Sequence, residues 1–117
     1  MLVLGPDVKI YLSTEVADMR KAINGLSVLV LDVIKENPQS GHVFVFFNKA
    51  KNKVKCLCWD RNGFILHYKR LERGRFKVSQ GSDGTIELSH DQLSWLLAGL
   101  DFMLMDTFSD LNYAHYY

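Results

Sequence analysis

The chain has 117 residues, of which 48% are hydrophobic, and this length predicts a single domain over residues 1–117 with one buried core. No apolar run approaches the roughly 18 to 20 residues that a membrane-spanning helix needs, and the N-terminus lacks the basic start of a signal peptide, so we expect a cytoplasmic protein without a membrane partner. The formal net charge of +1 conceals an asymmetry, because residues 49–77 carry ten basic and two acidic side chains while the rest carries four basic and eleven acidic ones.

The first predicted elements are a strand and a helix. Residues 8–12 alternate between apolar and polar side chains, which indicates a short strand. Apolar residues then recur at helical spacing from Met19 to Glu36, with Asp18 as the predicted N-cap. Arg20 and Lys21 would lie in the first helical turn, where positive charge opposes the helix dipole, and this slight cost favours a functional role for both.

Residues 41–78 predict four strands joined by short turns, which most simply form an antiparallel meander. These strands are expected at 43–47, 53–59, 64–71 and 75–78. Asn62-Gly63 predicts a tight hairpin, because both residues tolerate positive φ. Cys56 and Cys58 would share a strand face about 6.5 to 7 Å apart, too far for an undistorted disulfide, so we expect buried, reduced thiols.

The last predicted elements are a loop at 79–84, a strand at 85–88 and a helix from about His90 to Phe102. Ser89 and Gln92 have the spacing of a capping box. The full order is β-α-β-β-β-β-β-α, which predicts an α+β domain: a mostly antiparallel sheet with two helices packed on one face. The face of the second meander strand that carries the cysteines should pack on these helices, and its lysine-bearing face should meet solvent or a partner.

The sequence contains no arrangement of residues typical of catalysis. The four histidines are scattered without partners in a recognisable pattern, and the glycines occupy turns rather than a phosphate-binding loop. Asp18, Asp60 and Asp101 stand at helix caps, turns and ends, where aspartate has structural reasons to be. The sequence therefore predicts a protein that is not an enzyme and has no catalytic residue, metal site or cofactor.

Four segments carry a family resemblance: DMRKAINGL at 18–26, SGHVFVFFN at 40–48, KVKCLCWDRNGF at 53–64 and YKRLERGRF at 68–76. They resemble the small accessory protein, often called TnpB, from the second reading frame of the insertion-sequence-66 family of bacterial transposable elements. The resemblance runs from about Lys9 to Phe102, and a possible tail at 103–117 lies outside it. It implies a non-catalytic role in DNA transposition beside a separate, larger transposase.

The charge of residues 49–77 and the aromatic side chains among them favour contact with DNA, because cations bind the phosphate backbone and aromatic rings stack on bases. Little sequence specificity is expected, since no recognition helix is evident. Four of the candidates, around the turn at 72–74, would form a compact basic knob. The candidate DNA-binding residues are Arg20, Lys21, Lys53, Lys55, Trp59, Lys69, Arg70, Arg73 and Arg75.

An alternative interpretation needs no DNA. Lysines on an exposed strand face often serve only solubility, and those on an edge strand prevent aggregation. The protein would then be an interaction module that binds the transposase, or a second copy of itself, through the aromatic residues at 113–117 or through a sheet edge.

Overall fold

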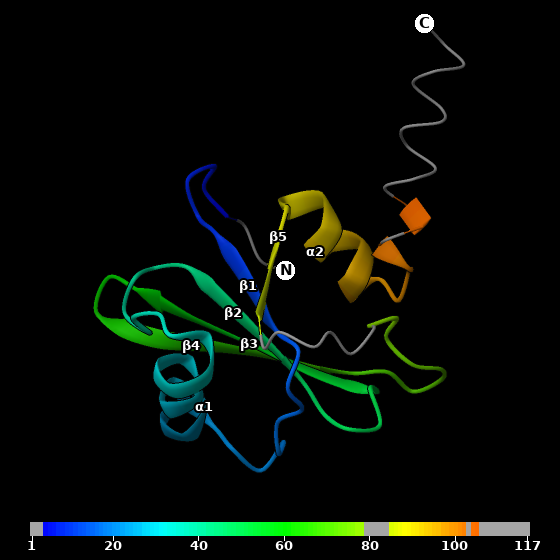
Figure 1. Ribbon diagram of the computed structural model, residues 1–117, viewed down its shortest axis with the longest axis horizontal. Helices are drawn as coiled ribbons and strands as arrows, with labels where there is room; N and C mark the ends of the chain where they lie inside the picture. Colours follow the sequence, from blue (N-terminus) through cyan, green and yellow to red (C-terminus); the bar gives the residue numbers. More distant parts are fainter. Residues whose placement is uncertain (1–3, 79–84, 103, 106–117) are drawn as a thin grey trace, which may run out of the picture.

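The computed structural model describes residues 4–78, 85–102 and 104–105, and its centre is a five-stranded sheet with the order β4-β3-β2-β1-β5 (Figure 1). The strands are β1 (Ile10–Ser13), β2 (Val43–Phe47), β3 (Lys53–Asp60), β4 (Gly63–Arg70) and β5 (Thr85–Leu88). β1 and β2 are parallel, and the other neighbours are antiparallel. The prediction of an α+β fold with a mostly antiparallel sheet is confirmed. No helix among the described residues is long and apolar enough to cross a membrane.

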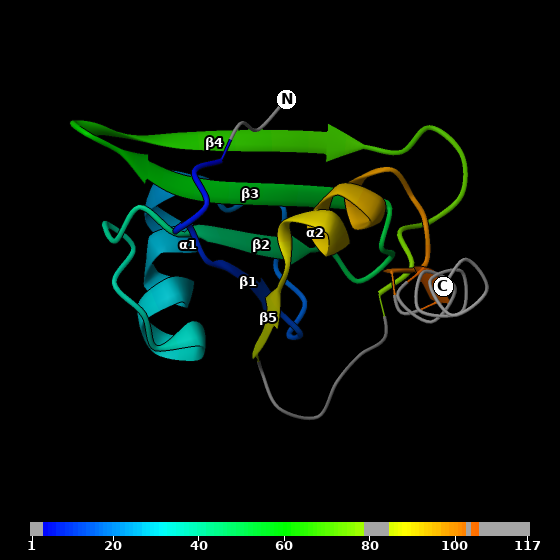
Figure 2. The same ribbon diagram turned by 90° about the horizontal axis from the view of Figure 1, so that it is seen from above.

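The helices lie on opposite faces of the sheet, so the prediction that both pack on one face is wrong. α1 (Ile23–Leu29), which continues as a π-helical segment η1 (Val30–Ile34), covers the face that carries Phe44 and Phe46. α2 (His90–Leu97) covers the other face (Figure 2). The reason lies in β2, whose sequence VFVFF is apolar at every position and buried throughout, so that both of its faces need a cover.

Residues 75–78 form no strand among the described elements, so the fourth strand of the predicted meander is absent while the order of the other elements is as predicted. The chain instead leaves the edge of β4 and inserts Phe76 into the core on the α2 side, where the side chain is only 2% exposed. The Phe76 ring lies edge-on to that of Phe47 with 5.2 Å between centroids. Burial of this large ring replaces the pairing that an edge strand would have gained.

The first helix begins later than predicted, and Asp18 is not its N-cap. α1 starts at Ile23, with Ala22 as the capping residue. The Asp18 carboxylate accepts a hydrogen bond from the backbone N–H of Arg20 (2.9 Å), and its carbonyl accepts one from Lys21 (3.0 Å), which makes a turn. Arg20 and Lys21 therefore precede the helix, and the argument from the helix dipole does not apply to them.

The capping box at the start of α2 is confirmed. Ser89 Oγ accepts from the backbone N–H of Gln92 (3.1 Å), and Gln92 Oε1 accepts from the backbone N–H of Ser89 (2.8 Å). The helix ends at Leu97 rather than Phe102, because Gly99 adopts a φ of 82°. The N–H groups of Gly99 and Leu100 then bond back to the carbonyls of Leu96 and Trp95, the pattern of a Schellman motif.

The hairpin between β3 and β4 is confirmed, but its turn lies one residue earlier than Asn62-Gly63. Asp60 pairs with Gly63, so the two turn residues are Arg61 and Asn62, and Arg61 takes the positive φ of 51°. The predicted loop at 79–84 lies outside the described residues. The same holds for the tail at 103–117 apart from residues 104 and 105.

Candidate nucleic-acid interface

Three segments that are distant in the sequence meet at one end of the sheet. They are residues 17–21 before α1, the β2–β3 turn at 48–52, and residues 71–77 after β4. The backbone N–H of Ala17 donates to the carbonyl of Phe47 (2.8 Å), and those of Leu71 and Phe76 donate to the carbonyls of Asn52 (2.8 Å) and Lys51 (2.7 Å). Figure 2 shows the β2–β3 turn and the segment after β4 at the same end, opposite the β3–β4 hairpin.

This arrangement gathers most of the basic side chains of the protein, and we call their set the basic end. Residues 17–21, 48–53 and 70–77 contain nine cations and only two acids, a local net charge of +7. Seven of the nine residues are exposed and two are partly exposed. The members of the basic end are Arg20, Lys21, Lys49, Lys51, Lys53, Arg70, Arg73, Arg75 and Lys77. Sequence reasoning had singled out six of them, and missed Lys49, Lys51 and Lys77 although they lie in the same basic stretch.

Two arginines of the basic end are paired with its two acids. Arg20 binds the Asp18 carboxylate through Nε (2.9 Å) and Nη2 (2.5 Å), and Arg70 binds Glu72 through Nη2 (2.9 Å). The hydrogen bonds from Arg20 lower the pKa of Asp18 to about 2, so this carboxylate is ionised at neutral pH. The Arg20 side chain is 92% exposed and that of Arg70 60%. Exposed ion pairs open at little cost, so both guanidinium groups remain available to a phosphate.

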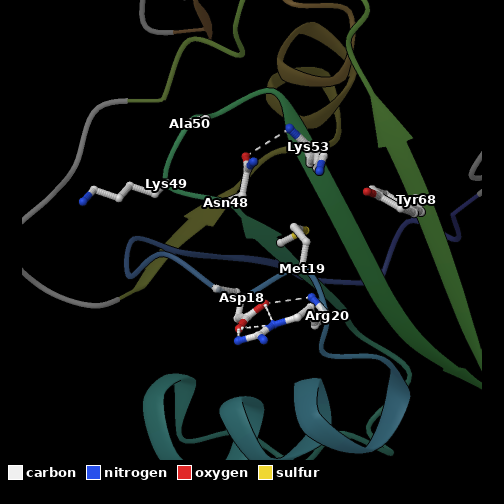
Figure 3. Close-up of a pocket in the computed structure, with 9 residues that line it drawn as sticks. Asp18, Met19, Arg20, Asn48, Lys49, Ala50, Lys53 and Tyr68 are labelled. Carbon is white, nitrogen blue, oxygen red and sulfur yellow. Dashed lines mark hydrogen bonds and ion pairs between the residues drawn. The ribbon is translucent and has the colours of Figure 1, made fainter.

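A pocket of about 500 Å³ opens within the basic end (Figure 3). Arg20, Lys49, Lys53 and Tyr68 are among the residues that line it, and they come from the segment before α1, the β2–β3 turn, β3 and β4. Asn48 also lines the pocket, but its amide shapes the turn: Oδ1 accepts from the backbone N–H groups at 52 and 53 (both 3.1 Å), and Nδ2 donates to the Asn52 side chain (2.7 Å). The pocket therefore combines cations with an aromatic ring.

Lys55, a predicted contact residue, points inside the protein. It is only 6% exposed, and Nζ donates to the carbonyls of Met19 (2.8 Å) and Lys21 (2.7 Å). The same ammonium lies 5.0 Å from the centroid of the Tyr68 ring. Lys55 thus fastens the segment before α1 to β3, and its carbonyl partners explain why residues 19–21 do not join the helix. Its charge is used within the fold rather than presented to a partner.

The predicted basic knob around the turn at 72–74 is not assembled as expected. Lys69 and Arg70 are neighbours on β4, so their side chains point to opposite faces of the sheet. Lys69 Nζ donates to the carbonyl of Leu97 (2.6 Å), near the C-terminus of α2, where a cation is favourable. Trp59 lies near the hairpin at the far end of the sheet, edge-on to Phe64 with 5.0 Å between centroids. Neither Lys69 nor Trp59 belongs to the basic end.

The cysteines lie on the face of β3 that packs against α2, as predicted, and both thiols are free. Burial raises the pKa of Cys56 to about 12, which keeps this thiol protonated. His67 lies directly opposite Cys56 on β4. Among the residues that the structure describes, no three histidine, cysteine, aspartate or glutamate side chains stand close enough together to hold a metal ion.

Comparison with known proteins gives a family but no function by name. The family described as "IS66 Orf2 like protein" matches residues 8–107. "Uncharacterized protein y4jC" of Sinorhizobium fredii (strain NBRC 101917 / NGR234) is 37% identical over 101 residues, covering 85% of this chain and 86% of its own. "Uncharacterized protein y4hO" of the same strain is 38% identical over 102 residues, covering 87% and 89%. No solved structure gives a significant match. The chain therefore belongs to the IS66 Orf2-like family.

Proposed function

We propose that this protein is a non-catalytic accessory factor of DNA transposition that holds the DNA backbone with its basic end and acts beside a separate transposase. Membership of the IS66 Orf2-like family supports the link to transposition. The observation that carries the DNA contact is the meeting of nine cations, from residues 17–21, 48–53 and 70–77, at one end of the sheet. Cations gathered in this way bind phosphates and release the counterions condensed on DNA.

The contact is with the phosphate backbone more than with base edges. Neither α1 nor α2 contains a lysine or arginine, so neither helix carries the side chains that most often read guanine in the major groove. The cations lie instead on turns and on strands next to the turns, and their arginines can grip a phosphate through two parallel hydrogen bonds. Backbone contacts position DNA without reading its sequence, so the sequence preference is weak.

The proposal is tested by removing three arginines of the basic end together. The variant Arg70→Gln, Arg73→Gln, Arg75→Gln should bind element-end DNA and unrelated duplex DNA more weakly, and to the same degree. Because each lost phosphate contact reduces the slope of log affinity against log salt by about 0.9, three lost contacts should make it shallower by about 2 to 3. Fluorescence anisotropy titrations at several salt concentrations measure both quantities.

The matched control removes the same number of charges elsewhere. Lys9, Lys35 and Arg61 are exposed and lie outside the basic end. The variant Lys9→Gln, Lys35→Gln, Arg61→Gln has the same net charge as the arginine variant and should keep the wild-type slope. Equal slopes for the two variants would mean that net charge, not the basic end, governs binding. A wild-type protein without affinity for duplex DNA at low salt would favour the alternative, a module that binds the transposase or itself. Among the described strands, β4 is at the edge of the sheet and has no partner on its outer side, so it could take up such a partner.

Removing the negative charge of Asp18 should strengthen DNA binding, whereas removing the arginines should weaken it. Asparagine at this position can still accept the backbone N–H of Arg20, but it loses the negative charge that holds the guanidinium group. Asp18→Asn should therefore strengthen binding to DNA and steepen the salt slope by up to about one contact's worth, roughly 0.9. Thermal stability should hardly change, because the ion pair is exposed. Unchanged affinity and slope would show that the Asp18 carboxylate does not compete with a phosphate for Arg20.

A further inference from the structure

Tyr68 is an unusual residue to find on the surface of a strand. Tyr68 is 53% exposed, although aromatic rings of this size are mostly buried. It also contributes an aromatic ring to the lining of the pocket. The buried Lys55 ammonium lies 5.0 Å from the ring centroid and is itself held by two backbone carbonyls. Lys55 is not among the described residues that line the pocket. The Tyr68 ring therefore has the Lys55 ammonium over it and is itself part of the pocket lining.

Three cations line the pocket together with this ring. They are Arg20, Lys49 and Lys53, and Figure 3 shows Tyr68 on one side of the pocket, Lys49 on the other with its side chain extending away from the ring, and Arg20 and Lys53 between. Asp18 also lines the pocket, and its carboxylate is held by Arg20. The side-chain amide of Asn48 is already hydrogen-bonded within the β2–β3 turn, so it does not offer a fixed hydrogen-bonding pattern to a base. The pocket can hold an aromatic ring and its phosphates without selecting one base.

A paired base cannot use such a pocket. In a duplex the faces of the bases are covered by their neighbours, and a protein ring reaches them only where the strand is unpaired. The volume of about 500 Å³ lies within the range of small-ligand pockets, roughly 300 to 1,000 Å³. Every base has a flat aromatic face, so stacking on a tyrosine tolerates any sequence. These properties distinguish unpaired DNA from duplex DNA.

We infer that the pocket beside Tyr68 takes up an unpaired nucleotide, with the base stacked on the tyrosine ring and the flanking phosphates held by Arg20, Lys49 and Lys53. The inference rests on the proposed function, because it states which form of DNA the basic end prefers. The protein would bind single strands and frayed ends in preference to intact duplex.

The experiment compares Tyr68→Leu, which removes the ring, with Tyr68→Phe, which keeps it. The probes are an oligothymidine and a duplex of equal length, titrated by fluorescence anisotropy at one salt concentration. Base stacking on an aromatic side chain corresponds to roughly 5- to 150-fold in affinity, so Tyr68→Leu should lose about that factor for oligothymidine. Its affinity for the duplex should stay at the wild-type value, and Tyr68→Phe should match the wild type on both probes.

A second measurement reports stacking directly and needs no variant. A single-stranded oligonucleotide that contains 2-aminopurine should lose fluorescence when the wild-type protein binds it, because the base stacks on the ring. Absence of this quenching, or an equal loss of affinity for both probes in Tyr68→Leu, would overturn the inference and leave the proposed function standing. Absence of binding to either probe by the wild-type protein would overturn both.

Discussion

Replacing Phe76 with alanine is expected to lower the free energy of unfolding by about 3 to 5 kcal/mol, the usual cost of truncating a buried aromatic ring. The Phe76 side chain is 2% exposed and lies edge-on to Phe47 in the cluster between the sheet and α2. Its removal leaves a cavity that the surrounding side chains can fill only in part. For a domain whose total stability is of the order of 5 to 15 kcal/mol, this is a large fraction.

Urea denaturation followed by circular dichroism measures the effect. The midpoint urea concentration should fall, while the slope of the unfolding free energy against urea concentration should stay nearly constant. The melting temperature should drop by about 10 to 20 °C. Lys77→Ala serves as the control, because this neighbouring side chain is exposed and its loss should change stability little. A loss below about 1 kcal/mol for Phe76→Ala would contradict the docking of residues 71–78 on the sheet.

The burial of Phe76 also matters for the proposed DNA contact. Phe76 lies directly after Arg75, and its backbone N–H donates to the Lys51 carbonyl in the β2–β3 turn (2.7 Å). Together with the bond from Leu71 to Asn52, Phe76 thus holds the arginines of the segment after β4 beside the lysines of the turn. Had this segment continued the sheet as a strand, its side chains would have alternated between the two faces.

Local signals in the sequence were enough for β1 to β5 and for the start of α2. The run VFVFF, the two-residue hairpin and the Ser89–Gln92 capping box each depend on neighbouring residues alone. The prediction that both helices pack on one face was wrong, although the sequence contains the reason. Because β2 is apolar at every position, both faces of the sheet have to be covered by other elements. The inward turn of Phe76 could not be predicted, because it depends on a contact with Phe47, a residue distant in the sequence that only the assembled sheet brings close.

In the candidate site, too, some features follow from the sequence alone and others only from the assembled fold. The basic stretch was evident from composition, but its assembly with Arg20 and Lys21 depends on hydrogen bonds between segments that are distant in the sequence, one from the backbone of Ala17 and one from the Lys55 side chain. Lys53 and Lys55 share one strand and one face, and the sequence offers no way to tell them apart. Only the position of the segment before α1, which lies over Lys55, decides that one lysine is buried and the other partly exposed.

This difference predicts opposite outcomes for two identical substitutions. Lys55→Met should lower the free energy of unfolding by about 1.5 to 3 kcal/mol, because the carbonyls of Met19 and Lys21 lose their charged donor. Lys53→Met should change stability by no more than about 0.5 kcal/mol, as is usual for a surface position. In DNA titrations the order reverses: Lys53→Met should make the salt slope shallower by about 0.9, the value of one phosphate contact. If the two variants are equally stable, the Lys55 ammonium is not held by these carbonyls, and it would then be as open to a phosphate as Lys53.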